Sequence, residues 1–153
     1  IAVLGGPATS HPSMMRRQGA QQAMEDAGIR FEDKLYGLSN YDFESAYHAM
    51  NGLLARRAEF TALFAMSDVI AFGAIRALVS AGLRVPEDVS VIGFDGITMS
   101  RYCVPVMTTI VQPSEQIALQ SIELLVRQIE HGTPAQTVTL QPELQQGESV
   151  RAL

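Results

Sequence analysis

Hydrogen-bonding residues follow each stretch that the sequence predicts to be a buried strand. They come directly after those stretches, at Gly5-Gly6-Pro7, Asn40-Tyr41, Met66-Ser67-Asp68, Asp95-Gly96 and Gln112. In an open parallel sheet, ligands bind outside the C-terminal ends of the strands. We therefore expect these residues to gather at one edge of a sheet and to bind a polar small molecule there.

Asp95 and Arg16 carry the charges best suited to such a site. The Asp95 carboxylate follows an apolar run and can accept two hydroxyl groups of a sugar, although an Asp-Gly pair also forms a common turn. Arg16 and Arg17 lie on one predicted helix, where one guanidinium can reach the ligand while the other stays in solvent. Tyr41 can stack on a sugar ring or serve as packing. Asp68 is interpreted first as a helix cap or first-turn acid.

Motifs for catalysis are absent from the sequence. Gly5-Gly6-Pro7 is followed neither by the Lys-Ser/Thr of a P-loop nor by the third glycine of a dinucleotide loop, and no Gly-x-Ser-x-Gly occurs. The three histidines lack metal-ligand spacing, and Cys103 is interpreted as a buried, unreactive thiol. We therefore predict a protein that is not an enzyme and needs neither a metal ion nor a cofactor.

Alternating strand-type and helix-type stretches must position these residues. Strands are expected at 1–4, 35–38, 60–65, 89–94 and 107–111, with short extended pieces at 137–140 and 144–146. Helices are expected at 13–27, from Asp42 to about 54, from Ser67 or Asp68 to 81, and at 113–130. Continuous apolar strands that alternate with helices indicate a parallel sheet covered on both faces. The predicted fold class is α/β, with a Rossmann-like sheet.

The charge balance argues against direct binding of nucleic acid. The chain has 153 residues, with 11 Lys and Arg against 16 Asp and Glu, and its densest basic spots are Arg16-Arg17 and Arg56-Arg57. Hydrophobic residues make up 47% of the chain, which suffices for a core, yet no apolar run approaches the roughly 18 residues that span a bilayer. A single cysteine fits a reducing compartment. Because a strand begins at residue 1, we expect a piece of a longer protein.

Two predicted helices carry more apolar surface than one sheet contact needs. Arg76 is the only charged residue between Val69 and Ala81, so this helix is apolar nearly all round. One face would cover the sheet, and the other would lie under more of the same protein or against a second subunit. The last helix has an apolar stripe at 117–129. We expect this stripe to be covered by a partner chain or repacked on this chain, because an exposed stripe promotes association.

Several motifs together resemble those of LacI/GalR-family transcription regulators. GLRVPEDVSVIGFD at 82–95 is similar to the family's GLRVPEDVSVIGFDD segment, and FTALFAMSD at 60–68 resembles its PTAVFAxND, with Phe60 in place of the proline. Shorter matches are AFGA at 71–74 for ALGA, TTIVQP at 108–113 for LTTVRQP, PELQQGES at 142–149 for PELVxRES and RRQG at 16–19 for RxxGF. The resemblance covers nearly the whole chain.

The resemblance implies a type I periplasmic-binding-protein-like fold, in which two Rossmann-like subdomains enclose a small-molecule cleft. Residues 1–112 and 135–153 would form the C-terminal subdomain, and 113–134 the crossover helix that belongs to an absent N-terminal subdomain. The implied effector-binding residues are Arg16, Tyr41, Ser67, Asp95 and Gln112. The implied homodimer interface contains Val69, Ile70, Phe72, Gly73, Met99 and Cys103. Ser67 stands where many sugar-responsive members have Asn, which leaves the ligand's identity open.

The sequence thus predicts the ligand-sensing domain of a cytoplasmic transcription regulator. A small effector, a sugar or sugar derivative, would bind it and modulate operator DNA binding by a helix-turn-helix in the absent N-terminal part. We expect a homodimer and no membrane association. The alternative is a periplasmic sugar-binding protein of a transporter, and an α/β enzyme is a third possibility. A helix-turn-helix or a signal peptide ahead of Ile1 would separate the first two.

Overall fold

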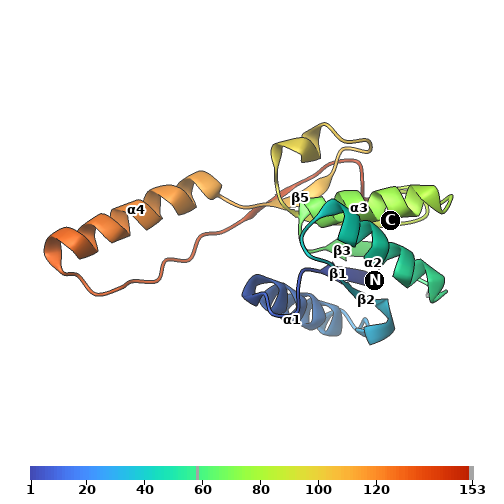
Figure 1. The fold of residues 1–153 in the computed structure, drawn as a ribbon, viewed down its shortest axis with the longest axis horizontal. Helices are drawn as coiled ribbons and strands as arrows, with labels where there is room; N and C mark the ends of the chain where they lie inside the picture. The colour runs from blue at the N-terminus through green and yellow to red at the C-terminus, as the bar shows by residue number, and fades with distance from the viewer. Residues whose placement is uncertain (58, 152–153) are drawn as a thin grey trace.

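Six strands form one sheet in the computed structural model, which describes residues 1–57 and 59–151 (Figure 1). The order across the sheet is β2-β1-β3-β4-β5-β6, and every neighbouring pair is parallel except β5 with β6. The strands are β1 (Ala2–Gly5), β2 (Tyr36–Leu38), β3 (Ala62–Ala65), β4 (Ser90–Asp95), β5 (Thr108–Val111) and β6 (Glu143–Gln145). The prediction of an α/β fold with a mainly parallel sheet is confirmed.

In the described part of the chain, three helices cover the two faces of this sheet. Helix α1 (His11–Asp26) lies on one face, whereas α2 (Phe43–Ala55) and α3 (Asp68–Ser80) lie on the other (Figure 1). The chain moves in one direction across the sheet from β1 to β2 and in the opposite direction from β2 to β3 and β4, so right-handed crossovers place these helices on opposite faces. Two short 3₁₀ helices, η1 (Asp33–Leu35) and η2 (Thr98–Arg101), precede β2 and follow β4.

Side-chain caps fix where α2 and α3 begin. The Asp42 carboxylate accepts a hydrogen bond from the Ser45 N–H at 2.7 Å, and the Ser67 hydroxyl accepts one from the Ile70 N–H at 3.1 Å. Of the two residues predicted to cap α3, Ser67 is therefore the one used. Past the end of α3, Gly82 has φ of 80°, a backbone conformation that a side chain would strain.

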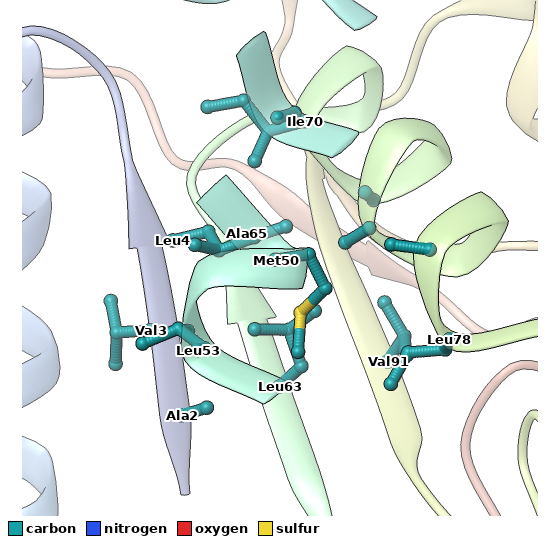
Figure 2. Packing of buried hydrophobic residues seen from close by; sticks show 14 of the residues in the cluster. Ala2, Val3, Leu4, Met50, Leu53, Leu63, Ala65, Ile70, Leu78 and Val91 are labelled. Atoms are coloured by element: carbon teal, nitrogen blue, oxygen red, sulfur yellow. The ribbon is translucent and has the colours of Figure 1, made fainter. Parts of the chain in front are cut away.

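The core lies between the sheet and helices α2 and α3 (Figure 2). Leu4 of β1, Leu63 of β3 and Val91 of β4 belong to one cluster with Met50 of α2 and Leu78 of α3, and all five side chains are fully buried. Burying a side chain of this size contributes roughly 1.5–3 kcal/mol. This cluster makes β1, β3 and β4 a rigid base for the residues at their C-terminal ends.

Helix α4 (Ser114–His131) extends away from the sheet (Figure 1), and none of its 18 residues is buried. Its apolar side chains stay in solvent, with Ile122 61% and Ile129 74% exposed. The prediction that this stripe is repacked on the same chain is therefore wrong, and its coverage by a partner chain stays a prediction. The returning segment at 137–140, expected to be extended, pairs with no strand among the residues that the structure describes. Within the described ranges, no helix is both long and apolar enough to cross a membrane.

Candidate functional site

Three polar side chains meet at the edge of the sheet where the parallel strands end. Asp95 is the last residue of β4, Gln112 follows β5, and Arg16 lies on α1, which follows β1. The Nε2 of Gln112 donates a hydrogen bond to Oδ1 of Asp95 at 2.6 Å, and Nη2 of Arg16 lies 3.5 Å from the same oxygen. The fold thus brings to Asp95 two residues that are 17 and 79 positions away in sequence, Gln112 and Arg16.

Two further contacts fix the Arg16 side chain. Its Nη1 donates to the carbonyl oxygen of Met66, just past β3, at 2.5 Å, and its Cζ lies 3.8 Å from the centroid of the Phe94 ring. The face of an aromatic ring attracts a guanidinium electrostatically. Sequence reasoning missed Phe94, although alternation along β4 puts it on the face that α1 covers. Arg16 therefore links the ends of β3 and β4, and 18% of its side-chain surface stays exposed.

Asp95 combines an unusual backbone with a partly buried charge. Its φ is 121°, outside the regions that L-residues prefer, and its carbonyl accepts a hydrogen bond from the Gln112 N–H at 3.1 Å. Burial raises the pKa of the Asp95 carboxyl above its ordinary value, more than Arg16 and the Gln112 amide lower it, and the charge of Asp68 adds to the increase. The protein thus holds a carboxylate at this edge at a cost in stability.

Asp95→Asn is expected to raise the free energy of unfolding at pH 7 in the absence of ligand. Because the pKa of Asp95 is higher in the folded state, the folded protein binds more protons than the unfolded one just above pH 4. This group's contribution to stability therefore falls as pH rises, and the gain from Asp95→Asn shrinks as pH decreases toward 4. Urea unfolding at several pH values measures the difference.

Asp88→Asn is the matched control, since its effect has the opposite sign. Hydrogen bonds from Arg84 lower the pKa of Asp88 to about 2, so this carboxylate adds stability at pH 7 that is lost as pH falls toward 2. Asp88→Asn is expected to lower the free energy of unfolding at pH 7. If both variants lose stability there, burial is not the dominant influence on Asp95.

Tyr41 lies at the same edge, beside the turn between β1 and α1. Its φ is 60°, and its ring covers Gly6 so closely that a Cβ at Gly6 would overlap the ring. The Tyr41 hydroxyl is 3.4 Å from Oγ of Ser10, the residue that caps α1. Tyr41 is therefore held by the turn that leads into the helix of Arg16, outside the Arg16–Asp95–Gln112 cluster itself.

The Ser67 side chain is buried at the start of α3. Its side chain is 4% exposed, and its hydroxyl is occupied as the cap of α3. The neighbouring Asp68 is the first-turn acid of α3, one of the two roles that the sequence offered for it, and it also accepts hydrogen bonds from Thr109 and Ile97. Ser67 and Asp68 are adjacent, and either residue type can cap a helix, so the sequence does not show which one caps α3. The backbone geometry after β3 makes Ser67 the cap.

Residues 1–150 match a family model described as the periplasmic binding protein-like domain. The chain is 39% identical over 137 residues to the HTH-type transcriptional regulator MalR of Clostridium butyricum, a match covering 90% of this chain and 41% of that protein. A complex of the transcriptional regulator CelR with cellobiose has a TM-score of 0.92 at 34% identity, over 97% of this chain and 46% of that one. A sugar-binding LacI-family regulator from Escherichia coli, complexed with phosphate, has a TM-score of 0.89 at 33% identity, over 97% and 54%.

The chain belongs to the periplasmic binding protein-like family. Within this family, it is an effector-binding domain of the LacI-regulator type, because the similar proteins are transcription regulators. The family resemblance seen in the sequence and the prediction of a domain that is not an enzyme are thereby confirmed. The chain spans less than half the length of the curated relatives it matches, 41% of one and 46% of another.

This periplasmic binding protein-like domain also carries an apolar groove between α2, α3 and η2, which we term the α3 groove. It encloses about 530 Å³ and is lined mainly by Phe43, Phe72, Ile75, Val79, Met99 and Val104. Arg76 is the one charged residue in its lining, and Cys103 completes it. Val104 is 92% exposed, so the groove opens directly to solvent.

Four of the six residues predicted to form a dimer interface stay at or near the surface of the domain. Phe72, Met99 and Cys103 line the α3 groove, whereas Val69 is half-buried outside it. The other two, Ile70 and Gly73, face the interior and cannot contribute side-chain contacts to an interface. Ile70 is fully buried in the core, and a Cβ at Gly73 would overlap the backbone of α2.

Cys103 is half-buried, and its thiol donates hydrogen bonds to the carbonyl oxygens of Ser100 at 3.2 Å and Pro105 at 3.1 Å. Burial raises the pKa of the Cys103 thiol, which keeps it protonated and poorly nucleophilic at neutral pH. In the part of the chain that the structure describes, no group of three or more His, Cys, Asp and Glu side chains could hold a metal ion.

Proposed function

We propose that this chain is the second subdomain of the effector-binding region of a longer, cytoplasmic LacI-type regulator. Its effector is a sugar or sugar derivative, held between this subdomain and an N-terminal one. Asp95, Arg16 and Gln112 hydrogen-bond the ligand and Tyr41 stacks on it, whereas Ser67 contributes only as the cap of α3. The CelR–cellobiose complex, which this chain resembles closely, supports a sugar as the ligand class.

The geometry of Asp95 is the observation that carries this proposal. Oδ1 already accepts from Gln112 and faces Arg16, while Oδ2 has no donor among the residues that the structure describes. A carboxylate fixed through one oxygen can offer the other to ligand hydroxyls, and Arg16 supplies donors beside it. The raised pKa of Asp95 is consistent with a charge kept for binding and not for folding.

Helix α4 supports the division into subdomains. Residues 113–134 form the crossover helix that belongs to the N-terminal subdomain, and 1–112 with 135–153 form the C-terminal one. The exposed apolar stripe of α4, which includes Ile122 and Ile129, supports this assignment because a helix with such a stripe normally lies against another element. Relatives of more than twice this length leave room for that subdomain.

The α3 groove is the surface on which two copies associate. Its lining is apolar except for Arg76, and an isologous interface repeats the same patch on both subunits. Effector binding then shifts the population of open and closed clefts and, through the dimer, the spacing of helix-turn-helix segments that contact the operator. The similarity to regulators favours this function over transport by a periplasmic sugar-binding protein.

Asp95→Ala in the longer regulator is expected to weaken cellobiose binding by about 5- to 150-fold, corresponding to the 1–3 kcal/mol lost with charged hydrogen bonds. Isothermal titration calorimetry with cellobiose, followed by other disaccharides, measures the affinity. Asp33→Ala is the control, because Asp33 also pairs with an arginine, Arg17, at 3.1 Å on the exposed surface. Equal affinities of Asp95→Ala and Asp33→Ala for a sugar that the wild type binds would contradict the assigned site.

A further inference from the structure

Asp68 is a buried carboxylate that the proposed ligand contacts do not use. It is fully hidden from solvent at the first position of α3. Oδ1 accepts a hydrogen bond from the Thr109 hydroxyl at 2.5 Å, and Oδ2 accepts one from the Ile97 N–H at 2.8 Å. Among the described residues it forms no salt bridge, so these hydrogen bonds and the N-terminus of α3 are what compensate its charge.

The partners of Asp68 lie on both sides of Asp95. Ile97 follows Asp95 by two residues, and Thr109 lies beside Gly93, two residues before Asp95, in the register of β4 with β5. A Cβ at Gly93 would overlap Oδ1 of Asp68, so the carboxylate reaches this position only because Gly93 has no side chain. Asp68 thus contacts the strand that leads into Asp95 and the turn that leaves it.

The backbone of Asp95 needs such a constraint. A non-glycine residue at φ of 121° has a strained backbone and persists only where its surroundings hold it. Gln112 holds the carbonyl of Asp95, and Asp68 holds the N–H of Ile97, two residues further along the chain. Without the second contact, the turn 95–97 could relax and the Asp95 carboxylate would change direction.

We propose that Asp68 is a positioning residue, which holds the turn 95–97 so that the Asp95 carboxylate faces the ligand. The part of this inference that concerns the ligand depends on the proposed function; the part that concerns the turn does not. Ile97 directly precedes η2, which carries Met99 of the α3 groove. The hydrogen bond from the Ile97 N–H to Asp68 therefore also connects the turn 95–97 with this groove.

Three variants of the longer regulator separate positioning from general stability. Asp68→Ala removes both hydrogen bonds. Asp68→Asn keeps an acceptor for the Ile97 N–H and an amide that can donate to Thr109. Ser149→Ala is the matched control, because Ser149 is also fully buried and bridges β4 and β5, donating to the Val91 carbonyl at 2.6 Å and accepting from the Thr108 N–H at 2.8 Å.

Hydrogen exchange measured by mass spectrometry on the segment 95–101 reports whether the turn is held. Asp68→Ala is expected to speed exchange at Ile97 by at least about tenfold, while Asp68→Asn and Ser149→Ala leave it within about threefold of the wild type. Cellobiose affinity, measured on folded protein, is expected to fall by about tenfold or more in Asp68→Ala only. Similar exchange in Asp68→Ala and Ser149→Ala would overturn the inference.

Two further outcomes are informative. Faster exchange in Asp68→Ala with unchanged affinity, while Asp95→Ala loses affinity, would show that the turn is not what directs the carboxylate, and the inference would fall. If the wild type binds neither cellobiose nor any other disaccharide tested, the proposed function fails instead. The exchange comparison still decides in that case whether Asp68 holds the turn.

Discussion

Gly93→Ala is expected to lower the free energy of unfolding of this domain by about 3 kcal/mol. The added methyl group would overlap Oδ1 of Asp68 and approach the Thr109 hydroxyl to 3.4 Å. Asp68 cannot move away without losing its hydrogen bonds to Thr109 and Ile97, which would leave a carboxylate buried and unpaired. Urea unfolding followed by circular dichroism measures the change.

Gly52→Ala is the matched control and should have the opposite sign. Gly52 lies within α2 with nothing within 4 Å of a Cβ, so alanine adds no clash there. Replacing an interior helical glycine by alanine raises stability by up to about 1 kcal/mol, because the unfolded chain loses conformational freedom. Equal effects of the two substitutions would show that the contact between β4 and Asp68 is looser than the structure has it.

Much of the fold follows from local pattern. The runs that become β3 and most of β4 are apolar without strict alternation, which distinguishes strands buried between two layers of helices from amphipathic edge strands. Once these strands are parallel, the residues after them must share one edge. That is why Arg16, Asp95 and Gln112 could be expected near one another from sequence alone.

Side-chain direction at the edge could not be predicted in the same way. Ser67 and Asp68 are adjacent, and both residue types cap helices, so composition does not say which one turns inward. The choice depends on Gly93 and Thr109, which are 25 and 41 positions away and leave space and a donor for a carboxylate. Such a pairing is visible only once β4 and β5 are aligned in register.

Which face of helix α3 is exposed could not be predicted from the sequence either. Its sequence is apolar nearly all round, so periodicity does not separate the face against the sheet from the face in solvent. Ile70 and Gly73 were assigned to an interface, yet both face the interior. Phe72 and Ile75, three residues apart, lie on the same side of α3, and both line the α3 groove. The close contact of Gly73 with α2 shows which face of α3 is buried.

Val104→Asp is expected to weaken self-association of the longer regulator by about 100-fold or more. Val104 lines the α3 groove and is 92% exposed in the single chain, so the substitution should leave the fold of the domain unchanged. In a dimer formed through this groove, the carboxylate would be buried among apolar side chains without a partner, which costs several kcal/mol. Twofold symmetry repeats that cost on each subunit. Analytical ultracentrifugation over a concentration series measures the dissociation constant.

Val150→Asp separates a specific effect on the groove from an added charge. Val150 is 40% exposed and lies outside the groove lining, so the same change in residue type should leave association within about threefold of the wild type. Unchanged association in Val104→Asp would show that copies associate elsewhere, and the α3 groove would then need another occupant. Loss of association in both variants would point to net charge, since each adds one negative charge to a chain whose formal net charge is already −5.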